Sequence, residues 1–270
     1  MATTDRPLTP GPRASSLSGQ GRGTVDPSSD LSVAEFGDRD APAVALLHGI
    51  GMSERYLRPL ATELATDHHV IVPDLPGFGR SPQPDSPPSV EHAAQTLLRL
   101  LEARGIESAT LVGHSMGAQV AVAMMTQAPQ LARSAVLVGP VVDPAAASAA
   151  RQAARLARSA VHEPAGVNAA ALHDYLRAGP RWYSAVLPRM FAFDIRAATA
   201  RVRGPVLVVR GQHDRVCPRP WARELAGAAP RGAWREVAGA AHAAMATHPG
   251  VVARWVRESG PAAVPDGQVR

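Results

Sequence analysis

The stretch Thr110-Leu-Val-Gly-His-Ser-Met-Gly117 decides the fold, because it joins a short apolar run to a helical pattern through a Gly-x-Ser-x-Gly turn. Such a sharp strand-to-helix turn holds its serine in strained backbone geometry. Glycine is expected at Gly113 and Gly117, because a side chain at either place would collide across the turn. Ser115 should then project above the carboxyl ends of the strands, where α/β sheets bind ligands.

Apolar runs of the same kind recur on both sides of this turn. Continuous apolar runs are typical of strands that are buried on both faces of a parallel sheet. The expected strands cover residues 43–48, 70–74, 110–115, 135–139, 205–210 and 235–238. Helical patterns lie between them, at about 54–66, 89–104, 116–128, 219–228 and 248–258. This alternation predicts a doubly wound α/β sheet, mostly parallel and covered by helices on both faces.

The alternation breaks between residues 143 and 200, where the sequence predicts helices and no strand. Ala- and Arg-rich stretches have helical patterns near 145–162, 166–178 and 180–193. A helical insertion is therefore expected between two strands of the sheet, after the strand that follows the helix over 116–128. The chain should divide into a disordered tail over 1–30, core over 31–142 and 201–260, this insertion over 143–200 and a flexible tail over 261–270.

Composition narrows the classes of protein that the chain can form. Hydrophobic residues make up 46% and charged residues 19% of the 270, so a sizeable core is expected and full-length disorder is excluded. Cys217 is the single cysteine, which excludes an intrachain disulfide and a cysteine-rich zinc module. No apolar run is long enough to span a membrane or to follow the first charges as in a signal peptide. We therefore expect a cytoplasmic protein without a membrane partner.

The net charge of +5 comes from arginine alone, since the sequence contains no lysine. Residues 143–203 hold nine arginines and four acidic residues, so the whole excess lies in that segment. A basic chain can indicate nucleic-acid binding, but no binding motif accompanies this charge, and no nucleic-acid partner is expected. Histidines and carboxylates occur only in scattered pairs, so no metal site is predicted.

A serine hydroxyl needs a base and an orienting acid to become a nucleophile. Gly211-Gln-His-Asp214 follows the next-to-last expected strand, and Gly239-Ala-Ala-His242 follows the last one. The order Ser115, Asp214, His242 is the order of this class of hydrolase. We predict that His242 takes the proton from Ser115 and that Asp214 holds the imidazole in the required tautomer.

Each of these roles has an alternative candidate. His213 and His248 lie near the predicted base in the sequence, and His248 also has the position of a helix cap. Asp143 follows the strand after the nucleophile helix and is an alternative acid. Either Asp143 or Asp214 could instead cap a helix or shape a turn, which is the commoner job of a lone Asp.

The loop His48-Gly49-Ile50-Gly51 follows the first expected strand. The backbone N–H of Ile50 is expected to form one half of an oxyanion hole, and the N–H of Met116, at a helix N-terminus, the other half. His48 and His114 are expected to fix loops by hydrogen bonds, because the mechanism leaves them no role.

Five motifs in this order make the chain resemble the α/β-hydrolase superfamily over about residues 31–260. They are His48-Gly49, Asp74-Leu-Pro-Gly-Phe-Gly-Arg-Ser81, Gly113–Gly117, Gly211-Gln-His-Asp214 and Gly239-Ala-Ala-His242. The resemblance implies a helical cap over the site. Haloalkane dehalogenases and epoxide hydrolases of this fold carry Asp at the nucleophile position. Ser115 therefore indicates acyl transfer to water instead.

The substrate pocket is expected between this site and the cap. The pocket candidates are Ser53, Arg181, Trp182, Tyr183 and Met190. Ser53 could also cap the helix that begins at Glu54, and the bulky residues could form the cap's own core.

The arginines of the cap bear on the charge of the substrate. Arg181 lies beside aromatic residues and is the main candidate for binding an anionic substrate. Arg151, Arg155 and Arg158 fall on one helical face, which could line the cleft or face solvent.

Together these features predict a cofactor-free serine hydrolase that acts on a small-molecule ester, in the manner of a carboxylesterase. C–C bond hydrolysis, thioester or lactone hydrolysis, perhydrolysis, and biosynthetic acyl transfer or cyclisation use the same triad and stay open. A non-catalytic ligand-binding protein of the same fold is a further alternative. The expected partner is the small-molecule substrate, and the sequence does not indicate an oligomeric state.

Overall fold

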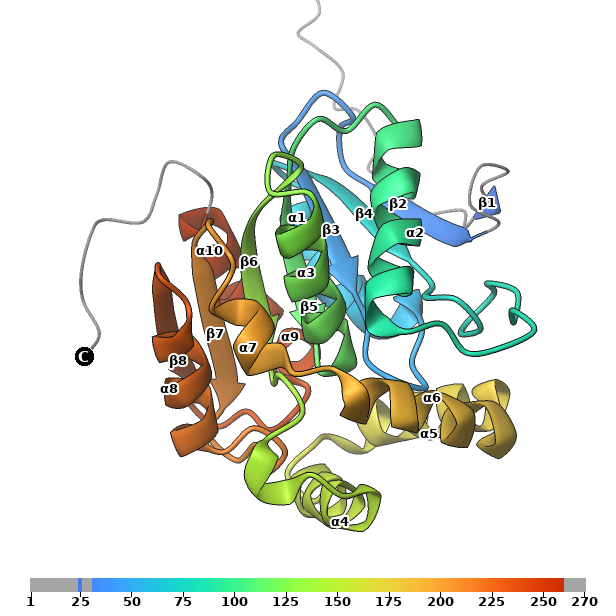
Figure 1. The fold of residues 1–270 in the computed structure, drawn as a ribbon, viewed down its shortest axis with the longest axis vertical. Coiled ribbons are helices and arrows are strands. Elements are labelled where there is room, and N and C mark those ends of the chain that lie inside the picture. Colours follow the sequence, from blue (N-terminus) through green and yellow to red (C-terminus); the bar gives the residue numbers. More distant parts are fainter. Residues whose placement is uncertain (1–23, 26–30, 260–270) are drawn as a thin grey trace, which may run out of the picture.

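The computed structural model describes residues 24–25 and 31–259 (Figure 1). Thr24–Val25 form a two-residue strand, β1, which pairs with β2. The rest of the predicted tails, within 1–30 and 261–270, lies outside the described residues.

The described strands form one eight-stranded sheet in the order β1-β2-β4-β3-β5-β6-β7-β8. From β4 to β8 all neighbours are parallel, whereas β2 pairs antiparallel with β1 and β4. The predicted mostly parallel, doubly wound sheet is therefore confirmed. Beside β1, the strands are β2 (Ser32–Phe36), β3 (Ala43–Leu47), β4 (His69–Pro73), β5 (Ala109–His114), β6 (Ala132–Val138), β7 (Val206–Gly211) and β8 (Gly232–Val237).

The central strands are buried on both faces, as their continuous apolar runs predict. Successive side chains of β3 alternate between two cores, with Ala45 and Leu47 in one and Val44 and Leu46 in the other. The strand β2 was not expected. Its sequence Ser-Val-Ala-Glu-Phe contains no continuous apolar run, since an antiparallel strand near the end of the sheet need not be buried throughout.

Helices cover both faces of the sheet (Figure 1). Apolar side chains of α2, α3, α7 and α8 belong to one core, and those of α1, α9 and α10 to the other. The bounds are η1 (Glu54–Leu57), α1 (Arg58–Leu64), α2 (Val90–Ala103), α3 (Met116–Gln127), η2 (Pro144–Ala146), α7 (Ile195–Thr199), α8 (Arg219–Ala228), α9 (Ala244–Thr247) and α10 (Pro249–Glu258). Within the described residues, none of the helices has both the length and the apolar character to cross a membrane.

Three further helices, which we call the inserted helices, separate β6 from β7. They are α4 (Ala149–Ala160), α5 (Ala165–Ala178) and α6 (Pro180–Ala192). Figure 1 shows them together beyond the carboxyl ends of the parallel strands. The sequence placed three helices and no strand in this interval, and the structure has these three helices there together with the short η2 and α7.

Candidate active site

Ser115 lies at the turn between β5 and α3, where the backbone is strained. Its φ of 55° and ψ of −116° make it the one non-glycine residue with positive φ in the described part of the chain. A Cβ on Gly113 would lie 2.4 Å from the carbonyl oxygen of Gly117, and one on Gly117 would lie 2.3 Å from that of Leu47. The turn therefore needs both glycines, as the motif predicts.

Asp214 and His242 form a buried pair beside this turn. Nδ1 of His242 donates to Oδ2 of Asp214 at 3.0 Å, and the two residues are 7% and 1% exposed. The other carboxylate oxygen of Asp214 accepts the N–H groups of Val216 and Cys217 at 2.8 and 3.0 Å. This arrangement fixes the carboxylate and leaves Nε2 of His242 available for a proton from Ser115.

The loop that carries Asp214 is braced by Arg210, a residue that the sequence analysis did not single out. The guanidinium of Arg210 donates to the carbonyl oxygens of Gln212, Asp214 and Cys217 at 3.2, 2.9 and 2.8 Å. It also pairs with Glu236 on β8. A buried arginine at the end of β7 thus fixes the position of the acid.

The environment of His242 favours its charged form. Burial lowers the pKa of His242, but the charge and hydrogen bond of the Asp214 carboxylate and the charge of Glu163 outweigh it, so the pKa is raised above its ordinary value. Gly139 lets the strand end approach the pair, because its φ is +56° and a Cβ there would lie 2.8 Å from Nδ1 of His242. The end of β6 therefore lies in direct contact with the predicted base.

The alternative base and acid have other partners. The ring of His213 stacks on that of His162 at 4.5 Å, and Nδ1 of His248 bonds to the hydroxyl of Thr247 at 2.9 Å. Asp143 accepts the N–H of Ala145 and forms an ion pair with Arg155 at 2.5 Å. Within the described residues the Ser115 hydroxyl has no hydrogen bond to any of these alternatives or to His242. What distinguishes His242 is its bond to Asp214 and its place beside Ser115 in the lining of one cavity.

Two buried histidines fix loops near the site, as expected. Nε2 of His48 accepts the N–H of Leu75 at 2.9 Å, so its Nδ1 carries the proton and donates to the carbonyl of Gly49 at 2.8 Å. Nε2 of His114 donates to the carbonyl oxygen of His242 at 3.1 Å. Burial lowers the pKa of both His48 and His114, and the positive charge of His242 lowers that of His114 further. Both therefore act as neutral connectors.

The backbone N–H groups of Ile50 and Met116 lie on the two loops that meet at Ser115. A Cβ on Gly49 would lie 3.1 Å from the Cβ of Ser115, so the loop before Ile50 touches the predicted nucleophile. Met116 is the first residue of α3, and neither N–H has a backbone acceptor within the described residues. Two free amides at this place could stabilise an oxyanion.

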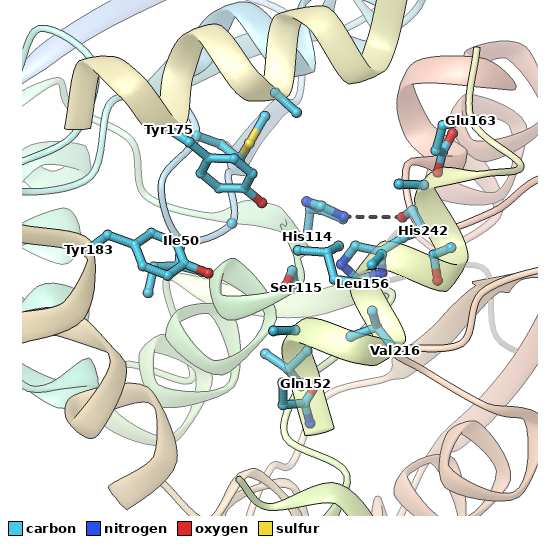
Figure 2. Close-up of a pocket in the computed structure, with 18 of the residues that line it drawn as sticks. Ile50, His114, Ser115, Gln152, Leu156, Glu163, Tyr175, Tyr183, Val216 and His242 are labelled. Atoms are coloured by element: carbon cyan, nitrogen blue, oxygen red, sulfur yellow. Dashed lines mark hydrogen bonds between the residues drawn. The ribbon is translucent and has the colours of Figure 1, made fainter. Parts of the chain in front are cut away.

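A cavity of about 670 Å³ opens between the sheet and the inserted helices, and Ser115 and His242 line it (Figure 2). Most of its walls are apolar, and they include Ile50, Met52, Val141, Leu156, Val167, Leu172, Leu187, Met190 and Val216. The small-residue face of α4, with Ala149, Ala150, Ala153, Ala157 and Ala160, completes one side. Figure 2 shows Tyr175 and Tyr183 across the cavity from His114 and His242.

Of the five pocket candidates, two line the cavity and three lie outside its lining. Tyr183 and Met190 line the cavity. Trp182 does not, because it is buried against Gly77, where a Cβ would lie 2.3 Å from its ring. Arg181 on α6 is exposed and lies outside the cavity lining. The fifth candidate, Ser53, also lies outside the cavity lining.

Ser53 serves neither of its two expected purposes. It precedes η1 without capping it, and its hydroxyl donates to Oδ2 of Asp174 on α5 at 2.7 Å. Ser53 therefore connects the core to an inserted helix. A Cβ on Gly51 would lie 2.3 Å from the ring of Tyr175, so α5 packs directly on this loop.

The arginine face of α4 turns away from the cavity. Arg151 and Arg158 are exposed, and Arg155 pairs with Asp143. None of the residues that line the cavity in the described part of the chain is an arginine. Of the two interpretations of this face, the solvent-facing one is confirmed.

Sequence reasoning missed most of the cavity lining, including two titratable residues, Tyr175 and Glu163. Glu163 lies between α4 and α5 and is the only acidic residue between 144 and 173, within an arginine-rich segment. That isolation was the one available signal. Tyr175 had no signal, because its role depends on how α5 packs against Gly51.

No group of three or more His, Cys, Asp or Glu side chains within the described ranges could hold a metal ion. Cys217 is buried, and burial raises the pKa of its thiol. Its backbone N–H is the part that serves the site, as a donor to Asp214.

Comparison with known proteins places this geometry in a family. A model described as "Alpha/beta hydrolase family" matches residues 44–255. Two curated relatives bear the name "Putative carbamate hydrolase RutD". The one from Pseudomonas savastanoi pv. phaseolicola is 32% identical over 71% of this chain and 83% of its own length. The one from Pseudomonas syringae pv. syringae is 31% identical over 78% and 90%.

Solved structures share the fold at lower identity. An esterase from Thermogutta terrifontis matches with a TM-score of 0.74 and 23% identity, over 88% of this chain and 96% of that one. The enol-lactonase from Burkholderia xenovorans LB400 matches with a TM-score of 0.72 and 22% identity, over 84% and 96%. The family match over most of the described residues, together with this fold, shows that the chain belongs to the alpha/beta hydrolase family.

Proposed function

We propose that the chain is a serine hydrolase that cleaves neutral small-molecule esters. The observation that carries this proposal is the meeting of three groups at one apolar cavity. The Asp214–His242 pair is buried beside it, with a hydrogen bond of 3.0 Å, and Ser115 lines it from a strained turn. The inserted helices would act as the cap over this site.

The proposed reaction proceeds through an ester of Ser115. Its hydroxyl oxygen attacks the substrate carbonyl while Nε2 of His242 takes the proton. The N–H groups of Ile50 and Met116 donate to the oxyanion. When the C–O bond breaks, the alcohol leaves with the proton from His242. Water then gives a proton to His242 and attacks the acyl group, which releases the acid and restores Ser115.

The charge of the cavity supports a neutral substrate. Its titratable residues are Tyr56, His114, Glu163, Tyr175, Tyr183 and His242, so the lining holds a carboxyl group and no arginine. A carboxylate on the substrate would be desolvated in this lining without a guanidinium to pair with it, which is costly. This disfavours a carboxylate-bearing dienoate and a CoA thioester.

A carbamate is a second candidate substrate. Two relatives at 31 and 32% identity are named as carbamate hydrolases. A carbamate presents the same kind of carbonyl to Ser115, and the steps above need only groups of this chain. We therefore propose a mechanism without a cofactor for either substrate.

Hydrolysis of a matched pair of esters tests the proposal. We expect kcat/KM for 4-nitrophenyl pentanoate to exceed that for the anionic 4-nitrophenyl hydrogen succinate by roughly a hundredfold. Ethyl carbamate and a dienoate serve as further substrates, and Ser115→Ala as the blank. Equal or better hydrolysis of the anionic ester contradicts the neutral substrate class. Release no faster than in Ser115→Ala for every substrate contradicts a hydrolase and favours a ligand-binding protein.

A further inference from the structure

Glu163 is a carboxylate that the inserted helices bring to the catalytic histidine. It lies in the turn between α4 and α5, and its side chain lines the cavity. Figure 2 shows it on the same side of the cavity as His242, opposite Tyr175 and Tyr183. The proposed reaction does not use it.

One oxygen of Glu163 holds the backbone next to His242. Its Oε1 accepts the N–H of Ala243 at 2.7 Å, across 80 residues of sequence. Ala243 follows the proposed base directly, and the carbonyl of His242 accepts from His114 at 3.1 Å. The loop that carries His242 is thus held from the sheet by His114 and from the inserted helices by Glu163.

The other oxygen of Glu163 is buried without a hydrogen-bond partner among the described residues. A buried carboxylate oxygen left without a donor is destabilising, so a nearby positive charge is needed to offset it. The imidazolium of His242, which forms when Ser115 gives up its proton, is such a charge. The titratable groups around the pair are Asp214, His114, Tyr56 and His248. The pKa of Glu163 is raised, mainly by burial, although the N–H of Ala243 and the charge of His242 act in the opposite direction. Asp214 is the only carboxyl group among the four.

We propose that Glu163 is a positioning residue, which holds the His242 loop and places a second carboxylate beside the imidazole. Because Glu163 lies between two of the inserted helices, the position of these helices then determines how readily His242 takes up a proton. The effect of Glu163 on catalysis rests on the proposed function. Its effect on protonation of the His242 imidazole does not depend on that function. The direction of the His242 pKa agrees with it, because the charge of Glu163 raises that pKa.

The variant Glu163→Gln tests the charge of the side chain separately from its hydrogen bond to Ala243. The amide oxygen can still accept the N–H of Ala243, whereas the negative charge is removed. Asp174→Asn is the matched control, since it makes the same change on α5, where Asp174 accepts from Ser53 and not from the His242 loop. Thermal unfolding of both variants checks that the fold is kept.

Two measurements report on His242. The first is its titration by NMR in protein labelled with ¹⁵N-histidine, with the signal assigned from His242→Ala. The second is the pH profile of Ser115 labelling by a fluorophosphonate, which needs no substrate. We expect the His242 midpoint and the acid limb of labelling to move to lower pH in Glu163→Gln. The maximal labelling rate should fall by roughly three- to tenfold, because the imidazolium loses stabilisation. Both midpoints should stay unchanged in Asp174→Asn.

A His242 midpoint that is the same in the wild type and in Glu163→Gln overturns the inference, because a merely structural tether would leave it unmoved. A midpoint that falls equally in Asp174→Asn also overturns it, since the effect would then belong to the inserted helices in general. A midpoint that falls in Glu163→Gln alone, with no labelling of Ser115 in any protein, supports the electrostatic role and contradicts the proposed hydrolase.

Discussion

Ser115 has a backbone conformation that residues with a side chain rarely adopt, and the residues around it explain how it is held. Gly113 and Gly117 leave the space for the turn, and Gly49 brings the neighbouring loop against the Ser115 side chain. Strain of this kind persists where the surrounding structure over-determines it, and it is concentrated at functional sites. The chemistry of the site therefore depends on which backbones can approach closely.

The orienting role of Asp214 gives a prediction with an internal control. In Asp214→Asn the side chain can donate to His242, which favours the wrong tautomer of the imidazole. We expect kcat to fall by roughly 10⁴-fold while substrate binding changes little. Asp143→Asn, which alters the alternative acid, should stay within a few-fold of the wild type. Steady-state kinetics on a neutral ester measures both, and a larger loss in Asp143→Asn would reverse the assignment.

The pH dependence of the reaction follows from the state of His242. As the proposed base it must be neutral to accept the proton of Ser115. Its pKa is raised above the ordinary value of a histidine, because the Asp214 and Glu163 carboxylates outweigh the effect of burial. We expect kcat/KM to rise with pH through this pKa and then to reach a plateau. A profile that is flat from pH 5 to 8 would show that His242 is not the base.

Gly139 gives a further prediction at the same scale. In Gly139→Ala the new Cβ would lie 2.8 Å from Nδ1 of His242 and 3.0 Å from Oδ2 of Asp214, at a φ of +56°. The pair must then separate, and we expect kcat to fall by roughly a hundredfold. Gly227→Ala on α8 is the control, because nothing lies within 4 Å of its added Cβ. Equal activity of the two variants would mean that the geometry of the pair matters little.

At the scale of elements, the inserted helices are attached to the core by specific long-range contacts. Ser53 donates to Asp174, and the side-chain amide of Gln119 donates to the carbonyl of Met190 at 2.9 Å. The ring of Trp182 on α6 packs on Gly77, just as the ring of Tyr175 on α5 packs on Gly51. These contacts hold α5 and α6 over the turn that carries Ser115.

Removal of one of these contacts should loosen the inserted helices. Ser53→Ala leaves the buried carboxylate of Asp174 without its donor. We expect the free energy of unfolding to fall by about 1–3 kcal/mol, with a larger effect on KM than on kcat. Urea unfolding and steady-state kinetics measure the two effects. Ser184→Ala, an exposed serine on α6, should change neither. A loss in kcat alone would place Ser53 in the chemistry instead.

The sequence predicted these elements better than it predicted their orientation. The positions of α4, α5 and α6 agree closely with the expected stretches, because helical periodicity is local. Which face of α4 meets the cavity is decided by packing. Alanines cover one face and arginines another, and the alanine face lines the cavity. Packing likewise decides that Arg181 on α6 is exposed and outside the cavity lining.

At the scale of the whole molecule, the sheet places the three predicted catalytic residues at the ends of different strands. β5, β7 and β8 run parallel, so the turns after them lie at the same edge. Chain order and the strand pattern were therefore enough to predict Ser115, Asp214 and His242 as a group. Contacts between distant loops, such as Ser53 with Asp174, have no signal in one sequence.

The separation of charge from the cavity is also a property of the whole molecule. The segment that holds the entire net charge forms the inserted helices, and its arginines lie outside the cavity that those helices cover. Composition showed the excess, but only the structure shows that it is directed away from the site. The basic character of the chain is therefore a feature of its surface.

The most direct measurement is labelling of the wild-type protein with a fluorophosphonate, followed by peptide mapping. An activated serine should give a single adduct on Ser115, and His242→Ala should give none under the same conditions. A small acylating agent, used in parallel, reaches the site even if the larger probe does not. An adduct on another residue, or no adduct from either reagent on the folded protein, would contradict Ser115 as a nucleophile activated by His242.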